Sequence, residues 1–215
     1  MDSLKIGLEK EWDRAAVSHP FLVAVRSGTI DPAQFERWLV QDYLFVQQFV
    51  RFAGSVLSRA PNMSDVKLLL AGIGALTDEI EHFERALDER GLAFRDATPL
   101  KATEQYTTQL RVWATSLTWP ELISVFWAIE NVYNQAWSSC RDAHSPYKEW
   151  VERWANHAFS EYVAALDRTA KNALETLPQR SSSESSSSPA QLGNVQGLIR
   201  GVLLLEDAFW SMALE

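Results

Sequence analysis

The sequence predicts an all-α protein, a single-domain multi-helix bundle of about seven helices. Apolar side chains recur at spacings of three and four residues through several long segments, as they do along one face of an α-helix. No useful stretch alternates apolar and polar residues as a strand would, and no fixed-period repeat is present. At 215 residues the chain can bury one substantial core, so we expect one domain over residues 1–215.

Composition narrows the classes of function. The chain is 47% hydrophobic and 22% charged, as in an ordinary globular protein. Its net charge of -8 and the lack of a basic cluster argue against nucleic acid and anionic membranes as partners. We find neither a signal-peptide core nor an apolar run of roughly 20 residues, so we expect a cytoplasmic protein. The single Cys140 excludes an intrachain disulfide.

The first elements are predicted from the residues at their ends. Residues 4–17 are weakly amphipathic and are predicted to form one helix. Pro20 can start another, a short apolar turn that closes at Gly28. Asp31 is then an N-cap before a proline, and Gln34 stands where a capping box needs it. These signals predict a long third helix.

Similar signals precede the next helices. Ser64 opens a helix that should stop at Gly91, and Thr98 precedes a helix over residues 100–116. Thr118, followed three residues later by Glu121, is a capping-box pattern for the central helix.

The last part of the chain is predicted to hold two helices and a linker. Ser145 and Pro146 should start a helix over residues 147–177. Residues 178–189 are rich in serine and too polar to offset their ordering entropy by burial, which predicts a flexible linker. A final helix follows over residues 191–215.

Three carboxylates interrupt apolar helix faces. Glu130 lies on one face with large rings, and Asp42 and Glu206 stand in similar stripes; the rings beside Glu130 are Phe126, Tyr133 and Trp137. An ionised carboxylate is costly on a buried apolar face, so these acids are functional candidates. They could instead reach solvent or pair with arginine. If they share a pocket, desolvation and like charge would raise at least one pKa.

Several aromatic residues accompany these acids. Rings at helical spacing usually form core, but rings interleaved with carboxylates could also hold a flat nitrogen heterocycle by stacking. The candidates are Tyr43, Phe45, Tyr106, Tyr133, Trp137, Trp154 and Trp210.

Two further patterns carry less weight. Glu79 and His82 have the spacing of a carboxylate-bridged di-metal site, but no second copy is present, so a solvated ion pair is the favoured interpretation. Cys140 lies near the end of the central helix and is interpreted as a bystander. We expect no metal and no cofactor.

Three stretches resemble the TenA (thiaminase II) family, whose fold is haem-oxygenase-like: HPFLVAV, FERWLVQDYLFVQQFVRFAG and LLLEDAFWSMALE. The resemblance extends over nearly the whole chain. It implies that Asp42 binds an aminopyrimidine and that Glu206 is a catalytic carboxylate. It also implies an aromatic pocket formed by Phe45, Tyr106, Tyr133 and Trp154.

One departure from the thiaminase branch is informative. That branch has a cysteine nucleophile four residues before the tyrosine matched by Tyr133, where this chain has Ile129 beside Glu130. The chain is thus similar to the glutamate-bearing branch. That similarity implies hydrolysis of formylamino- and amino-pyrimidines to hydroxymethylpyrimidine, with Glu206 and Glu130 as the acid–base groups.

The resemblance also suggests a homo-oligomer that takes a small-molecule aminopyrimidine substrate and has no nucleic-acid or membrane partner. Two other classes stay open from the residues. A di-metal oxidase on the same fold would use Glu79, His82 and the three acids. A non-catalytic pyrimidine-binding or interaction protein would not depend on Glu206 for turnover.

Overall fold

The computed structural model describes residues 3–141, 147–175 and 189–215. Within these ranges every regular element is helical, which confirms the predicted all-α class. The elements are a 3-10 helix η1 (Ser3–Lys5), then α1 (Glu9–Ala16), α2 (Pro20–Ser27), α3 (Pro32–Leu57), α4 (Met63–Glu89), α5 (Lys101–Ser116), α6 (Trp119–Ser139), α7 (Lys148–Trp154), α8 (His157–Glu175) and α9 (Pro189–Leu214).

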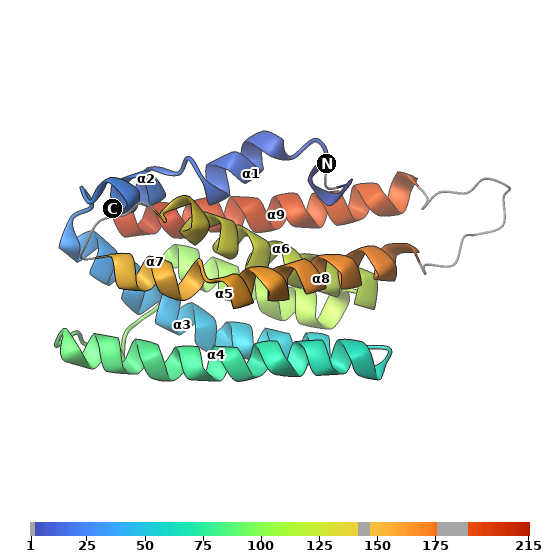
Figure 1. Ribbon diagram of the computed structural model, residues 1–215, viewed down its shortest axis with the longest axis horizontal. Coiled ribbons are helices and arrows are strands. Elements are labelled where there is room, and N and C mark those ends of the chain that lie inside the picture. The colour runs from blue at the N-terminus through green and yellow to red at the C-terminus, as the bar shows by residue number, and fades with distance from the viewer. Residues whose placement is uncertain (1–2, 142–146, 176–188) are drawn as a thin grey trace, which may run out of the picture.

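The longer helices run roughly along one axis of the molecule (Figure 1). Helices α3 and α4 form an antiparallel pair at one side, and α9 lies at the opposite side against α1 and α2. Helix α6 passes through the middle and contacts helices on every side, including α3, α8 and α9. Residues 122–132 of α6 are all buried, so this helix is the centre of the bundle.

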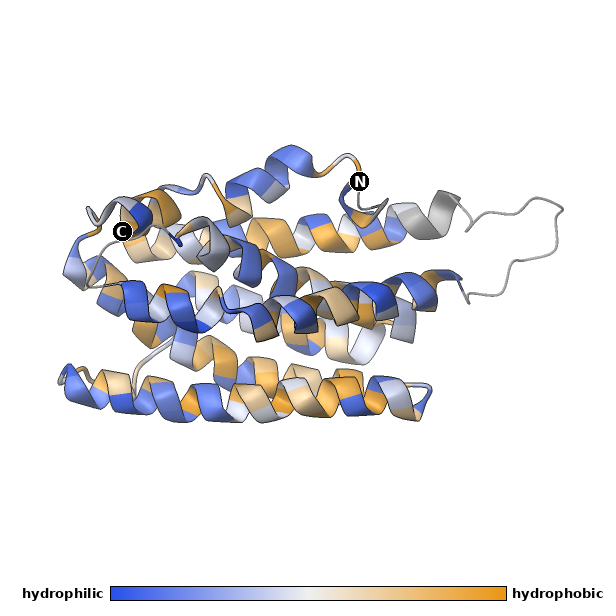
Figure 2. Ribbon diagram, viewed as in Figure 1, coloured by the Kyte–Doolittle hydropathy of each residue, from blue (hydrophilic) through white to orange (hydrophobic). Residues whose placement is uncertain are grey.

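A cluster of indole rings lies in the core. The ring of Trp38 lies 5.1 Å from that of Trp137, 5.7 Å from that of Trp154 and 6.0 Å from that of Trp210. These four rings come from α3, α6, α7 and α9, so they join helices that are far apart in sequence. Hydrophilic residues mark the outer sides of α1 and α8 (Figure 2).

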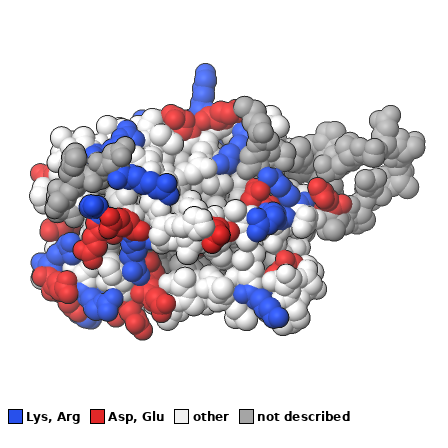
Figure 3. Space-filling view, in the orientation of Figure 1, with Lys and Arg blue, Asp and Glu red and all other residues white. Residues whose placement is uncertain are grey.

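The surface agrees with the composition. On the face seen in Figure 3, basic side chains are interspersed with acidic ones and form no continuous basic area. In the described part of the chain, no helix is long and apolar enough to cross a membrane.

The N-terminal helices differ from prediction in two details. Residues 4–17 do not form one helix, because Gly7 adopts a φ of 78° and separates η1 from α1. Asp31 caps α3 as predicted, with its side chain accepting from Ala33 N at 2.8 Å. Gln34 does not complete a capping box; its side-chain amide donates to the carbonyl of Leu214 at 3.0 Å. The glutamine thereby ties the start of α3 to the end of α9.

Two later caps were also predicted at the wrong residue. Helix α4 is capped by Asn62, whose side chain accepts from the two following backbone N–H groups of residues 64 and 65 at 3.0 Å. Thr98 does not cap α5; the N–H of Leu100 donates to Gln41 Oε1 at 2.8 Å. The Thr118 prediction is confirmed, because its N–H donates to the Glu121 carboxylate at 2.8 Å.

The predicted helix over residues 147–177 is divided in two. It breaks between α7 and α8, where Asn156 Oδ1 accepts from Phe159 N at 2.8 Å. Ser145, Pro146 and residues 178–188 of the expected linker lie outside the described residues. The last helix begins at Pro189, so this residue belongs to α9 and not to the linker.

Candidate active site

A cavity of about 640 Å³ lies inside the bundle and is lined by residues of every helix from α3 to α9. All seven site residues predicted from the sequence are at its wall: Asp42, Phe45, Tyr106, Glu130, Tyr133, Trp154 and Glu206. The three carboxylates come from α3, α6 and α9, whose apolar stripes therefore meet at this cavity.

Asp42 is held by a tyrosine of the central helix. Its side chain is 1% exposed, and its Oδ2 accepts a hydrogen bond from Tyr133 Oη at 2.8 Å. Burial raises the pKa of Asp42 well above its usual range; the Tyr133 hydrogen bond opposes this rise, and the charges of Glu79 and Glu206 add to it.

Glu206 has the same kind of partner on a different helix. Its Oε1 accepts from Tyr106 Oη at 2.6 Å, and both residues are buried. Burial raises the pKa of Glu206 to about 7, although the Tyr106 hydrogen bond lowers it. At neutral pH this carboxyl group can therefore both give and take a proton.

Glu130 lies on the cavity wall from α6 and is 6% exposed. Burial, with a smaller contribution from the charge of Glu79, raises the pKa of Glu130 to about 8. This carboxyl group is therefore mostly protonated at neutral pH. The cavity thus holds three buried acids, and burial raises the pKa of each one.

Aromatic rings line the space around these acids. Tyr133 lies against Trp210 with centroids 6.3 Å apart and planes 18° apart, and its edge faces Trp154 at 5.6 Å. Phe45 and Tyr106 are 4.7 Å apart on the other side. Two predicted candidates are not on the cavity wall: Tyr43 donates to Glu84 and Trp137 is buried in the indole cluster.

Glu79 is a cavity residue that sequence analysis placed in solvent, and that interpretation was wrong. Its side chain is 14% exposed, accepts from the Trp154 indole N–H, and pairs with Arg153 Nε at 3.1 Å. Burial raises its pKa, while Arg153 and the indole lower it. No local signal identifies this contact, because its partners lie on α7, far along the chain from α4.

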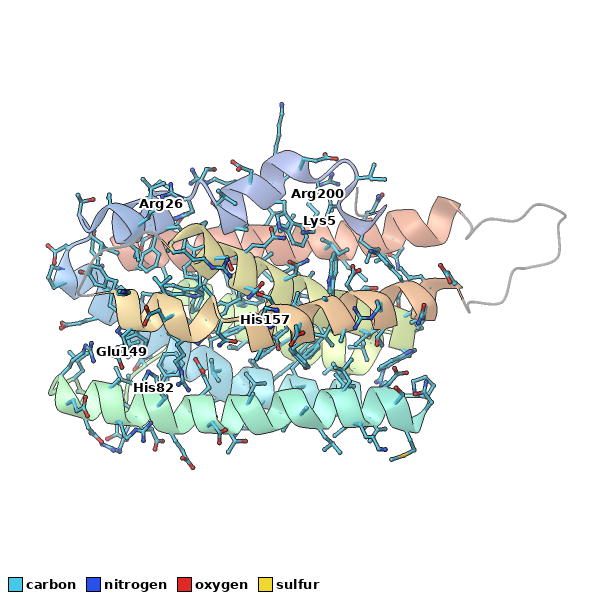
Figure 4. All side chains as sticks on the ribbon, viewed as in Figure 1. Lys5, Arg26, His82, Glu149, His157 and Arg200 are labelled. Carbon is cyan, nitrogen blue, oxygen red and sulfur yellow. The ribbon has the colours of Figure 1, made fainter. Side chains whose placement is uncertain are left out.

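The predicted ion pair between Glu79 and His82 is not formed, because Glu79 pairs with Arg153 instead. His82 lies in the space between α4 and α7 near Glu149 (Figure 4), with its ring 5.0 Å from that of Trp150. Among the described residues, no group of three His, Cys, Asp or Glu side chains lies close enough to hold a metal ion.

Cys140 is apart from the cavity. It is buried and donates from its Sγ to the carbonyl of Leu22 at 3.5 Å, between α6 and α2. Burial raises the pKa of its thiol, which makes it a poor nucleophile. Ile129, where the thiaminase branch is expected to have its cysteine, lines the cavity instead.

Comparison with known proteins agrees with this architecture. A family model described as the TENA/THI-4/PQQC family matches residues 8–215. A probable bifunctional TENA-E protein of Glycine max is 33% identical over 97% of this chain and 94% of its own length. An aminopyrimidine aminohydrolase of Halalkalibacterium halodurans is 22% identical over 94% of this chain and 89% of its own.

Solved structures give the same result for the fold. A TenA homologue from Pyrococcus furiosus superposes with a TM-score of 0.87 at 25% identity, covering 98% of this chain and 97% of its own. A protein of Shewanella denitrificans with a heme oxygenase-like fold superposes with a TM-score of 0.72 at 11% identity, covering 98% and 90% of the two chains. The bundle therefore has the predicted haem-oxygenase-like fold.

Proposed function

Because the chain belongs to the TENA/THI-4/PQQC family, we propose that it hydrolyses formylamino- and aminomethyl-pyrimidines from thiamin breakdown to hydroxymethylpyrimidine. The observation that carries this proposal is a pair of tyrosine–carboxylate contacts in one aromatic cavity, Tyr133 with Asp42 and Tyr106 with Glu206. The names of the Glycine max and Halalkalibacterium relatives also support it.

Asp42 is assigned to binding. Its Oδ2 accepts from Tyr133, and no hydrogen bond to Oδ1 is found among the described residues, so Oδ1 is available to a ligand. An aminopyrimidine protonated on its ring nitrogen offers two donors side by side, the ring N–H and the amino group, and an ionised Asp42 can accept them with Oδ1 and the remaining lone pair of Oδ2. The rings assigned to packing against the heterocycle all line the same cavity: Phe45, Tyr106, Tyr133 and Trp154.

Glu206 and Glu130 are assigned to proton transfer. In hydrolysis of the aminomethyl substrate, water attacks the exocyclic carbon while the C–N bond breaks, and one proton must leave the water while another reaches the departing amine. A pKa of about 7 at Glu206 suits both transfers near neutral pH, and Glu130 at about 8 is available as a proton donor.

The chemistry of Ile129 and Cys140 supports hydrolysis without a thiol nucleophile. Ile129 presents only an apolar side chain to the cavity, and Cys140 is buried elsewhere with a raised thiol pKa. We therefore expect thiamin itself not to be cleaved. No observation favours the di-metal oxidase or the non-catalytic pyrimidine-binding protein over a hydrolase.

The direct test is release of ammonia and formate from aminomethyl- and formylaminomethyl-pyrimidine, with thiamin assayed beside them. We expect hydroxymethylpyrimidine from the first compounds and no product from thiamin. Cleavage of thiamin would mean that the protein has a nucleophile that the proposed mechanism does not include. Inertness toward every compound would remove the proposed activity.

Glu206→Gln should lower kcat on the aminomethyl substrate about 10²–10⁴-fold, the usual worth of general acid–base catalysis, with a small change in product affinity. The matched control is Asp207→Asn. Asp207 is the next residue on α9 but pairs with Arg14 at the surface, so its substitution should leave kcat unchanged. Normal turnover in Glu206→Gln would disprove the assignment.

Asp42→Asn should instead act on binding. The amide keeps one acceptor for Tyr133 but loses the negative charge, so we expect KM to rise by about tenfold or more, corresponding to a charge-assisted hydrogen bond. Steady-state kinetics and direct titration with hydroxymethylpyrimidine measure this. An unchanged KM would move the anchoring role to another residue.

A further inference from the structure

Trp154 is fixed at the cavity wall by a carboxylate of another helix. Its indole N–H donates to Glu79 Oε1, which joins the last residue of α7 to α4. The other oxygen of the same carboxylate, Glu79 Oε2, accepts from Arg153 Nε at 3.1 Å. Two successive residues at the end of α7 therefore bind one carboxylate of α4.

The rings around Trp154 restrict its plane more than they select its orientation. Its indole lies 4.7 Å from that of Trp137 and 5.3 Å from that of Trp150, and the ring of Tyr133 meets it edge-on at 5.6 Å. Ring packing depends mainly on area and plane, and the χ2 torsion of an aromatic side chain has two broad wells. The N–H lies on one edge of the indole, so an acceptor on that side favours one of the two orientations. Glu79 is that acceptor.

Glu79 is itself kept in place by Arg153. The Glu79 side chain is 14% exposed and the Arg153 side chain is 30% exposed, so this ion pair is largely withdrawn from water. A carboxylate in such a position is costly unless it is paired, and the guanidinium supplies the opposite charge. The pair therefore holds an acceptor at a fixed place beside the indole, and an ionised acceptor binds an N–H more strongly than a neutral one does.

Trp154 connects this ion pair to the site. Its ring lines the cavity, and the phenol of Tyr133, which it meets edge-on, also donates to Asp42. If the indole could turn over, a ligand would have to order it on binding and would lose affinity. Glu79 lines the cavity too, but each of its oxygens already has a partner within the chain. It is therefore suited to hold a neighbouring side chain and not a ligand.

We propose that Glu79 is a positioning residue that orients the Trp154 indole for packing against the pyrimidine ring. This inference rests on the proposed function for the identity of the ligand. The indole is assigned to binding and takes no part in proton transfer. Loss of its hydrogen bond to Glu79 should therefore raise Kd and KM without lowering kcat, as expected for an interaction made equally in the ground state and the transition state.

The first test compares two substitutions of Glu79 by calorimetric titration with hydroxymethylpyrimidine. Glu79→Met removes the acceptor, and we expect its Kd to be about tenfold higher than that of Glu79→Gln, the equivalent of ordering one side chain on binding. Glutamine is the matched control, because its side-chain oxygen can still accept from the indole N–H. Both variants lose the negative charge and the ion pair with Arg153, so the difference between them measures the indole contact. Their kcat values should agree within about twofold.

Trp154→Phe adds a test that a merely structural role of Glu79 would fail. Phenylalanine keeps an aromatic ring but has no N–H, so in that background Glu79→Met and Glu79→Gln should differ in Kd by less than about twofold. The same tenfold difference in both backgrounds would overturn the proposal, because the effect of Glu79 would then not pass through the indole N–H. Equal Kd values for the two Glu79 variants in the otherwise wild-type chain would overturn it as well.

Titration with the product separates this inference from the proposed function. Wild-type protein that binds hydroxymethylpyrimidine but hydrolyses neither substrate would remove the proposed reaction, and the Kd values of the variants would still decide the role of Glu79. Wild-type protein that does not bind hydroxymethylpyrimidine would remove both.

Discussion

Glu206 shows what a folded chain does to a carboxyl group that it buries with one hydrogen bond. Its pKa rises from an ordinary 4.5 to about 7, because the Tyr106 hydroxyl replaces only part of the lost hydration. The protein therefore keeps an ionisable group in a position where ionisation costs stability. A stability measurement can detect this cost without any substrate.

We expect Glu206→Gln to be more stable than wild type at alkaline pH. Below about pH 4.5 the glutamate is protonated in both states and imposes no cost. As pH rises from there to about 7, the unfolded chain loses this proton before the folded chain does, so the free energy of unfolding of wild type falls. Glutamine at this position cannot ionise, but its side-chain oxygen can still accept the hydrogen bond from Tyr106.

The advantage of the variant should therefore grow from near zero at pH 4.5 to about 3 kcal/mol by pH 8, at roughly 1.4 kcal/mol per pKa unit. Urea unfolding of both proteins across this pH range measures the difference. A pH-independent difference would mean that Glu206 is not the group that titrates.

Individual residues also show where sequence reasoning reached its limit. Asp42, Glu130 and Glu206 could be selected because each interrupts an apolar stripe. Glu79 could not, because its neighbours Asp78, Glu81 and Glu84 make that part of α4 read as solvated. What buries Glu79 is Arg153 and Trp154, and contacts between distant helices leave no local pattern.

At the scale of an element, the junction between α7 and α8 is the clearest difference from prediction. One helix was predicted over residues 147–177 because this stretch contains neither glycine nor proline. Asn156 ends it by capping α8 through Phe159 N, and its own amide donates to the carbonyl of Arg153 at 2.5 Å. Proline-marked starts, as at Pro20 and Pro32, were predicted correctly because proline fixes the backbone locally.

Asn156→Ala should destabilise the protein by about 1 kcal/mol, the usual cost of losing an N-cap. Asn156→Asp is the matched control, because aspartate keeps an acceptor for Phe159 N and should retain most of the stability. Chemical denaturation of the three proteins tests this. If alanine is tolerated as well as aspartate, the cap does not hold the junction.

For the whole molecule, the site is a product of nonlocal packing. Asp42 lies on α3, Tyr106 on α5, Tyr133 on α6 and Glu206 on α9, and neither tyrosine–carboxylate contact joins neighbouring helices in the chain. The fold class and the seven wall residues followed from periodicity and family resemblance. The hydrogen-bond partners and the Arg153–Glu79 contact required the assembled bundle.

Because the site residues come from helices that are distant in the chain, catalytic activity should require the complete fold. The indole cluster of Trp38, Trp137, Trp154 and Trp210 joins α3, α6 and α9, which carry Asp42, Tyr133 and Glu206 of the site. We expect the urea midpoint from tryptophan fluorescence to coincide with the midpoint from activity, as in a two-state transition. Activity lost at lower urea than fluorescence would show that the site opens before the indole cluster does.

The position of Glu206 on the last described helix also bears on the order of events during refolding. A chain that has collapsed around α3 and α6 would already pack Trp38 against Trp137, yet it would lack the carboxyl group of α9 and the phenol of α5 that faces it. Contacts between segments so distant in sequence form slowly because closing long loops is entropically costly. After dilution from denaturant, catalytic activity should therefore return with the slowest refolding phase. Any faster phase should yield compact molecules that have no catalytic activity.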